Sequence, residues 1–235
     1  GLYETVAFCE NDPKCQQVLK KHWPSVYSYG DITKLEYHGG YLYSEDCGVT
    51  NIDVICGGFP CQDLSVAKRD HEGLGGSRSG LWSEYLRLIR QIRPKGVFIE
   101  NVSALRSRGL DRILRDLNSV GYDAEWHCLT AKAFGAYHER DRLFILAYNR
   151  SFGREGFEPF QYSQEVGQGW ESCKEVMQQI YDNPFERSDS YPQPLLCGMD
   201  ARSPGRVDRL KQLGNTVYWP IVEQLGYHMY ENIIG

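Results

Sequence analysis

Residues 52–61 read IDVICGGFPC, an apolar run that passes through two glycines and a proline into a cysteine. A short apolar run bounded by turn residues is typical of a buried β-strand that ends in a loop. Residues 96–101, GVFIEN, repeat this arrangement and end in a carboxylate and an amide. Between the two runs, residues 84–93 carry apolar side chains at the i, i+3, i+4 and i+7 positions of one helical face. This strand–helix–strand order predicts neighbouring parallel strands in an α/β fold.

The same alternation extends along the rest of the chain. Further strands are expected at residues 5–9, 25–27, 124–129 and 143–147, and further helices at residues 12–22, 110–117 and 217–233. The pattern predicts a doubly wound, Rossmann-like α/β domain with a mainly parallel sheet. Residues 149–205 have no sustained period and are rich in glycine, serine, aromatic and charged residues, so we expect a small irregular insertion there.

Polar or reactive groups come directly after four of the predicted strands. They are Glu10, Asp31, the segment 59–61, and Glu100 with Asn101. Ligands of open α/β sheets bind outside the carboxyl ends of the strands. These groups are therefore the first candidates for a functional site.

Cys61 and Glu100 have the chemistry of a nucleophile and an acid. A cysteine at a strand end near a helix N-terminus can have a lowered pKa and act as a thiolate, although a buried inert thiol fits the position equally well. A carboxyl group such as Glu100 can protonate a ring nitrogen if burial raises its pKa. Its alternative role is that of a capping or ion-paired carboxylate.

Arg140 and Arg142 stand two residues apart at the start of a predicted strand, so both side chains are expected on one face. Two guanidinium groups on one face suit recognition of a carbonyl oxygen or a phosphate. Surface ion pairs with Glu139 or Asp141 are the simpler alternative.

Composition limits the class of protein. The chain of 235 residues has a formal net charge of −5, yet residues 66–142 carry 14 lysines and arginines against 10 aspartates and glutamates. This segment, with a net charge of +4, can present a basic face to nucleic acid, or simply a solvated helical surface. None of the eight cysteines forms a C-x-x-C pair, so no metal site is expected. No apolar run is long enough for a membrane helix and the first residues lack signal-peptide features, so we expect an intracellular protein.

Taken together, four short motifs resemble the DNA cytosine C5-methyltransferase family in order and approximate spacing. The resemblance covers residues 5–148 and 206–230. The motifs are Phe59-Pro60-Cys61-Gln62, Glu100-Asn101-Val102, Arg140-Asp141-Arg142 and Gly214-Asn215-Thr216-Val217.

The resemblance implies a Rossmann-like S-adenosylmethionine-dependent methyltransferase that acts on double-stranded DNA. Cys61 would add to carbon 6 of a flipped-out cytosine, and Glu100 would hydrogen-bond ring nitrogen 3. Arg142 and Arg140 would hold the base carbonyl and position Glu100. The residues that it implies for S-adenosylmethionine are Glu10, Asp31, Pro60, Leu81 and Asn215.

The resemblance also implies a domain plan, with a catalytic domain at residues 1–148, a target-recognition region at 149–205 and a return to the catalytic domain at 206–235. The family's F-x-G-x-G motif is absent. We therefore expect a truncated fragment, a disrupted gene product or one half of a split enzyme, whose missing segment or second chain would add a central strand. The expected setting is a bacterium, a phage-infected cell or a eukaryotic nucleus, with restriction–modification as a role.

Three alternatives stay open. The first is a tRNA cytosine methyltransferase of the same fold, which would carry Pro-Pro-Cys-Gln where this chain has Phe59-Pro60-Cys61-Gln62. The second is a cysteine hydrolase, which the Pro60 and Gln62 neighbours of Cys61 disfavour because they do not form a glycine-flanked elbow. The third is an inactive DNA-binding remnant that keeps the pocket without the cofactor loop.

Overall fold

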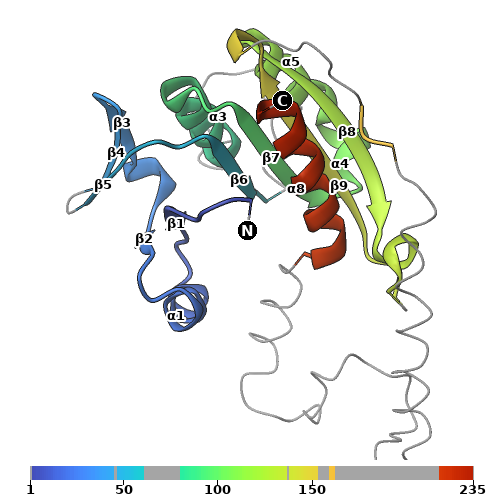
Figure 1. Ribbon diagram of the computed structural model, residues 1–235, viewed down its shortest axis with the longest axis horizontal. Helices are drawn as coiled ribbons and strands as arrows, with labels where there is room; N and C mark the ends of the chain where they lie inside the picture. The colour runs from blue at the N-terminus through green and yellow to red at the C-terminus, as the bar shows by residue number, and fades with distance from the viewer. Residues whose placement is uncertain are drawn as a thin grey trace, which may run out of the picture. The chain divides into compact units, whose positions relative to one another are not determined.

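The computed structural model describes most of the predicted α/β domain (Figure 1). The described residues are 2–44, 47–60, 80–136, 138–152, 159–161 and 217–234. The chain divides into two compact units, the first comprising residues 1–129, 141–160 and 225–235, and the second residues 130–140 and 161–224. Cys61, Asn215 and most of residues 149–205 lie outside the described residues, so the predictions made for them stay predictions.

A four-stranded sheet forms the centre of the first unit, with the strand order β6-β7-β9-β8. The strands are β6 (Val54–Gly58), β7 (Gly96–Val102), β9 (Asp141–Asn149) and β8 (Tyr122–Thr130). β6 and β7 are parallel and are joined through the helix α3 (Gly80–Ile92), as the sequence predicted. β9 runs antiparallel to β7, so this sheet is mixed. The α/β class is confirmed.

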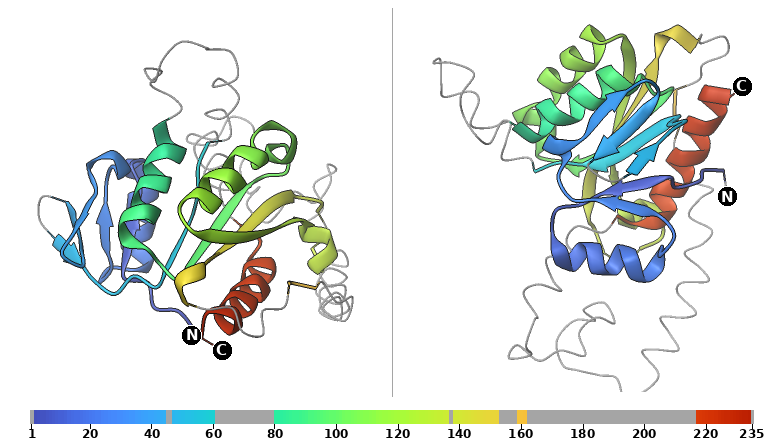
Figure 2. Two further views of the ribbon diagram at one scale, coloured as in Figure 1. Left: turned by 90° about the horizontal axis from the view of Figure 1, so that it is seen from above. Right: turned by 90° about the vertical axis from the view of Figure 1, so that its left-hand side faces the viewer.

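Helices cover both faces of this sheet (Figure 2). On one face lie α3, α4 (Leu105–Arg108) and α5 (Leu110–Ser119), whose apolar side chains form one core with β7 and β9. On the other face lies α8 (Trp219–Ile234), whose Met229 packs so closely on β7 that a Cβ on Gly96 would meet its sulfur at 3.0 Å. β7 is therefore buried on both sides.

Two small sheets precede the central one. β1 (Ala7–Cys9) pairs in parallel with β2 (Tyr27–Tyr29), and the helix α1 (Pro13–His22) joins them. The Asp12 carboxylate accepts a hydrogen bond from the Lys14 backbone N–H, and Pro13 is the first helical residue, so the predicted helix start is confirmed.

The second small sheet was not predicted from the sequence. It is an antiparallel meander of β3 (Glu36–His38), β4 (Tyr41–Ser44) and β5 (Cys47–Val49). Gly39 and Gly40 turn the chain between β3 and β4 with φ values of 59° and 89°, a two-residue turn that glycine adopts readily. Leu88 of α3 packs against this sheet while Trp82 and Ile89 pack against the central one, so α3 links the two cores.

Three short 3₁₀ segments complete the described elements: η1 (Ile32–Lys34), η2 (Ala131–Phe134) and η3 (Arg150–Phe152). No helix among the described residues is both long and apolar enough to cross a membrane.

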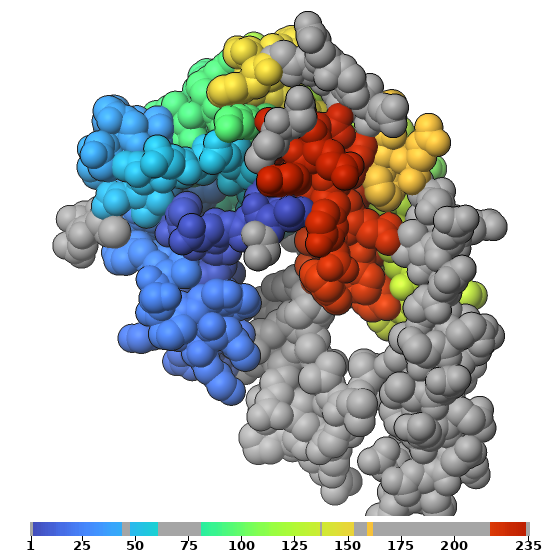
Figure 3. Space-filling view, viewed as in Figure 1, coloured from blue at the N-terminus to red at the C-terminus, as the bar shows by residue number. Residues whose placement is uncertain are grey.

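The chain start lies beside α8, which is exposed on the face shown in Figure 3. The Tyr3 hydroxyl donates to the Gly226 carbonyl oxygen at 2.9 Å, and the Tyr3 ring meets the Tyr230 ring edge-on at 6.1 Å. The amino-terminal segment and α8, which are far apart in the sequence, are therefore in direct contact.

Glu125 of β8 ties α8 to the sheet. Its carboxylate is bonded by His228 of α8 at 2.8 Å, by the Tyr148 hydroxyl at 2.8 Å and by the Phe160 backbone N–H at 2.9 Å, with His127 at 3.3 Å. Burial by itself would raise the pKa of Glu125. The hydrogen bonds outweigh burial and hold this pKa well below its usual range.

The pKa of Glu125 is lower in the folded state than in the unfolded state, where it is 4.5. The ionised Glu125 side chain therefore stabilises the fold fully above pH 4.5, and this stabilisation is lost as the pH falls through the folded-state pKa. We expect Glu125→Gln to lower the free energy of unfolding by about 2 kcal/mol near pH 7. The difference from the parent should narrow as the pH falls below 4.5. Urea unfolding followed by circular dichroism measures both quantities.

Asp123→Asn is the matched control, because Asp123 lies on the same strand and makes a more exposed 3.6 Å ion pair with Arg150. Asp123→Asn should lower the free energy of unfolding by less than about 1 kcal/mol. Equal losses in the two variants, or a Glu125→Gln difference that does not change with pH, would contradict this account of the network.

Candidate active site

The end of β6 lies directly against Glu100 of β7. The parallel register places Gly58 opposite Glu100, and a Cβ on Gly58 would approach the Glu100 carbonyl oxygen to 2.9 Å. Only glycine therefore fits at this point without a shift of backbone. Phe59 and Pro60 follow, and Cys61 is the next residue in the sequence. The segment that leads into the predicted nucleophile thus begins beside the predicted acid.

Glu100 forms an ion pair with Arg142 of β9. The Arg142 Nε donates to Glu100 Oε1 at 2.9 Å, and about a fifth of each side chain is exposed. Arg142 Nη1 also donates to the Asp141 carbonyl oxygen at 2.8 Å, which fixes the guanidinium plane. The structure therefore brings together two of the four predicted catalytic residues and sets the direction of the carboxylate.

Glu100 lies within its strand and not after it, which corrects the predicted strand end. The predicted strand stopped at residue 99, whereas β7 extends to Val102 because β9 pairs with it as far as Val102 and Arg142. The sequence of residues 100–102 does not show that β9 pairs with this segment and keeps it in the sheet.

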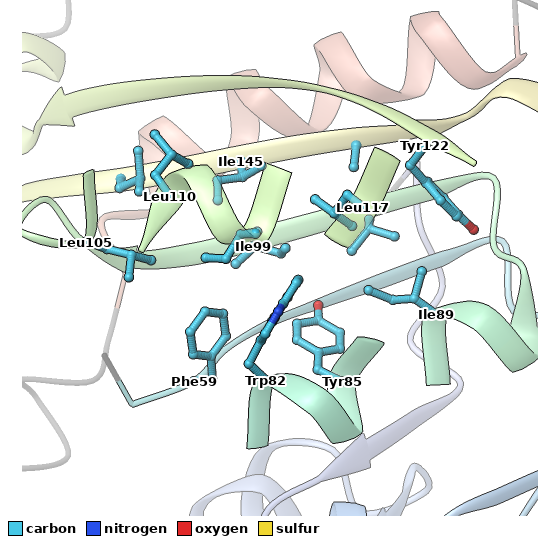
Figure 4. Packing of buried hydrophobic residues seen from close by; sticks show 14 of the residues in the cluster. Phe59, Trp82, Tyr85, Ile89, Ile99, Leu105, Leu110, Leu117, Tyr122 and Ile145 are labelled. Atoms are coloured by element: carbon cyan, nitrogen blue, oxygen red, sulfur yellow. The ribbon is translucent and has the colours of Figure 1, made fainter. Parts of the chain in front are cut away.

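Phe59 anchors the same segment in the core (Figure 4). Its ring is 8% exposed and lies 5.2 Å from the Trp82 ring of α3, centroid to centroid. Trp82 is itself held by the hydrogen bond from its indole Nε1 to Asp116 Oδ2 at 2.8 Å. The segment before Cys61 is thus attached to α3 as well as to β7.

Asn101 is a site residue whose role the sequence did not reveal. Its side chain is 5% exposed, and its Nδ2 donates to the Phe59 carbonyl oxygen at 2.8 Å. Its Oδ1 accepts from the Val102 backbone N–H at 2.9 Å. A buried amide next to Glu100 in an otherwise apolar strand was the available signal, because buried polar groups are retained with partners.

The predicted cofactor residues Glu10 and Asp31 lie together at the carboxyl end of the β1–β2 sheet. The Glu10 backbone N–H donates to the Tyr29 carbonyl oxygen at 2.8 Å, and Glu10 Oε1 accepts from the Asp12 backbone N–H at 2.8 Å. Partial burial, followed by the negative charges of Asp31 and Glu10, raises the pKa of the Cys9 thiol to about 11. Both carboxylates are therefore close to the end of β1.

Asp31 is held in position by the segment that follows it. Its Oδ1 accepts from the Thr33 backbone N–H at 2.9 Å and from the Thr33 hydroxyl at 2.8 Å, and these bonds lower the pKa of Asp31. Leu81, at the start of α3, is partly buried against the central core, and Pro60 is exposed.

Arg140 belongs to the second unit and precedes β9, which starts at Asp141. Its φ of 33° is one that side-chain-bearing residues rarely adopt. The alternation of side chains along a strand, which predicted that Arg140 and Arg142 share a face, therefore does not extend to Arg140. Partial burial and the Arg140 charge lower the pKa of His138. The His138 ring also meets Tyr218 edge-on at 5.9 Å, and Tyr218 donates to the Phe134 carbonyl oxygen at 3.4 Å.

Comparisons with known proteins identify the family to which the chain belongs. A family model described as C-5 cytosine-specific DNA methylase matches residues 1–195. The Type II methyltransferase M.CviJI of Paramecium bursaria Chlorella virus IL3A is 31% identical over 156 residues, which cover 66% of this chain and 40% of that protein. The Type II methyltransferase M2.BsuMI of Bacillus subtilis (strain 168) is 33% identical over 159 residues, which cover 63% of this chain and 38% of that protein.

Solved structures are similar at lower sequence identity. A mutant DNMT2 from Spodoptera frugiperda is 17% identical, with a TM-score of 0.49 over 68% of this chain and 46% of that one. The Dnmt2 methyltransferase of S. pombe is 16% identical, with a TM-score of 0.47 over 71% of this chain and 46% of that one. The chain spans 32–40% of the length of the first eight curated relatives it matches.

The Glu100–Arg142 pair should contribute to stability because both side chains are largely buried. Arg142→Met would leave the Glu100 carboxylate without this partner, and we expect it to lower the free energy of unfolding by about 2–3 kcal/mol. Arg115→Met is the matched control, since Arg115 pairs with Asp111 at 2.8 Å with about three quarters of each side chain exposed. That change should cost less than about 1 kcal/mol. Urea unfolding measures both changes. If the two variants lose the same free energy of unfolding, the Glu100–Arg142 pair contributes no more than an exposed ion pair.

Proposed function

Because the chain belongs to the C-5 cytosine-specific DNA methylase family, we propose that it acts as a DNA cytosine C5-methyltransferase with S-adenosylmethionine as methyl donor. One observation carries the proposal: the Glu100–Arg142 pair lies beside Gly58, at the start of the segment that leads through Pro60 to Cys61. A carboxyl group, a guanidinium group and a cysteine are the groups that activation of a cytosine ring requires.

The proposed chemistry starts with Cys61. Its thiolate adds to carbon 6 of a cytosine that has been flipped out of the duplex, which makes carbon 5 nucleophilic. S-adenosylmethionine, when bound, supplies an electrophilic methyl group. After carbon 5 has taken the methyl group, a base accepts the proton of carbon 5 and the bond between carbon 6 and sulfur breaks, which restores the ring double bond and releases Cys61 as a thiolate.

In this proposal Glu100 takes up a proton and donates it in a hydrogen bond to ring nitrogen 3, which draws electron density away from carbon 6 as the thiolate adds. Arg142 holds the Glu100 carboxylate in place through its 2.9 Å bond. With Arg140, it also contributes positive charge toward the base carbonyl. The ion pair thus gives Glu100 one direction before the base arrives, which is the benefit of preorganisation.

Glu10 and Asp31 fit the polar part of S-adenosylmethionine, because two carboxylates at the ends of adjacent parallel strands suit hydroxyl and amino donors. We propose that Glu10 accepts from the ribose hydroxyls and Asp31 from the adenine amino group. The hydrogen bonds from Asp12 and Thr33 hold the two carboxylates in fixed directions. Pro60, Leu81 and Asn215 complete the proposed set.

Double-stranded DNA is the proposed partner, and residues 149–205 are the proposed target-recognition region. Base edges in the major groove distinguish all four base pairs, so this region would read the site there. The relatives named as Type II methyltransferases suggest a role in restriction–modification.

Glu100→Gln tests the proposal. The amide keeps the shape of the carboxyl group but loses the proton-transfer chemistry, so methyl transfer should fall about 100-fold or more. Binding to duplex DNA should change by less than about threefold, because binding rests mainly on phosphate contacts. Transfer of a labelled methyl group to a duplex library, together with filter binding, measures the two quantities.

Parallel reactions with tRNA separate the proposed substrate from the alternative of the same fold. Labelling of tRNA but not of duplex DNA would overturn the DNA assignment. Equal losses of methyl transfer and DNA binding in Glu100→Gln would instead make Glu100 a structural residue.

A further inference from the structure

Asn101 is one of two polar side chains that are buried among the described residues, the other being Asn149. Burial of an amide is unfavourable unless its donors and acceptors are satisfied. The Asn101 side chain bonds two backbone groups, one through its amide nitrogen and one through its amide oxygen. The bond to Phe59 joins segments that are 42 residues apart in the sequence, whereas the bond from Val102 is to the neighbouring residue.

The chemistry of the two partners fixes the orientation of the amide. The Val102 backbone N–H is a donor and needs the amide oxygen, whereas the Phe59 carbonyl is an acceptor and needs the amide nitrogen. Asn101 therefore cannot flip without breaking both bonds. It holds the Phe59 carbonyl 2.8 Å from its nitrogen in one defined direction.

The contact lies between the two groups that the proposed reaction needs. Asn101 is the neighbour of Glu100, and Phe59 is two residues before Cys61. The Phe59 side chain is fixed separately by Trp82, and Gly58 lies against the Glu100 backbone. The Asn101 bond joins this segment to the strand of Glu100 through a side chain.

We propose that Asn101 is the positioning residue that holds residues 58–60, which lead to Cys61 in the sequence, relative to Glu100. The inference rests on the proposed function, since it assigns Asn101 a task within the same site. Asn101 does not touch the base in this account. It acts through the Phe59 carbonyl, and a displacement of about 1 Å at the nucleophile is enough to slow an enzyme about 100-fold.

Asn101→Leu removes the hydrogen bonds at similar volume. We expect kcat for methyl transfer to fall about 10-fold to 100-fold, with KM for DNA and for S-adenosylmethionine within about twofold. Asn149→Leu is the matched control, because Asn149 is equally buried and bonds the Arg93 and Pro94 carbonyl oxygens near the start of β7. It should lower stability while kcat per folded molecule stays at the parental value.

Hydrogen exchange of peptides that cover residues 55–60 provides a readout that needs no activity. Exchange should rise in Asn101→Leu and not in Asn149→Leu. If exchange rises but the parent chain transfers no methyl group to any substrate, the proposed function fails and the positioning contact stands. If exchange in this segment is the same in the parent and in Asn101→Leu, the positioning role is wrong.

Asn101→Asp serves if the leucine variant does not fold, since it has the same shape but turns a carboxylate oxygen toward the Phe59 carbonyl. Its kcat should be below about a tenth of the parental value at pH 8.5, because two acceptors face each other. The ratio to the parent should rise toward pH 6 as the carboxyl group gains a proton that it can donate. Parental kcat at pH 8.5, or a low ratio that does not change with pH, would overturn the proposal.

Discussion

The pairing of β6 with β7 is the constraint on which the proposed active site depends. Its register sets Gly58 against Glu100, and this approach is possible because Gly58 has no Cβ. A shift of one residue would turn the Glu100 side chain to the other face of the sheet and away from Arg142. The register is protected because β7 is buried on both faces, between the core of α3, α4 and α5 and the helix α8. The packing of the domain and the geometry of the site are thus set by the same strand.

The site is built from polar contacts that are attached to this apolar frame. Arg142 reaches Glu100 from β9, and Asn101 reaches the Phe59 carbonyl oxygen from β7. Both polar side chains belong to strands whose other residues are packed. The polar groups are therefore already held in place and lose little conformational freedom when a substrate binds. The Glu125 network joins α8 to the sheet in a similar way, through one partly buried carboxylate. The central sheet therefore carries both the core and the proposed chemistry.

Much of this arrangement could be predicted from the sequence because it is local. Apolar runs, helical periodicity and the Asp12-Pro13 helix start are visible in single segments, and the α/β class follows from their order. Contacts between segments were not visible. The antiparallel approach of β9 extends β7 beyond residue 99, and the β3–β5 meander depends on packing against α3. The Asn101 bond likewise depends on a distant part of the chain, the Phe59 carbonyl group. For Cys61 and Asn215, the sequence motifs still provide the assignment.

The central claim is that Cys61 is a nucleophile toward a cytosine ring, and a covalent adduct tests it most directly. The chain is incubated with S-adenosylmethionine and a library of duplexes in which cytosine is replaced by 5-fluorocytosine. Carbon 5 of that base cannot lose a proton, so the enzyme stays attached after methyl transfer. The account predicts an adduct that peptide mass spectrometry locates at Cys61 and that is absent from Cys61→Ala. An adduct that forms equally well in Cys61→Ala, or methyl transfer to DNA by that variant, would contradict it.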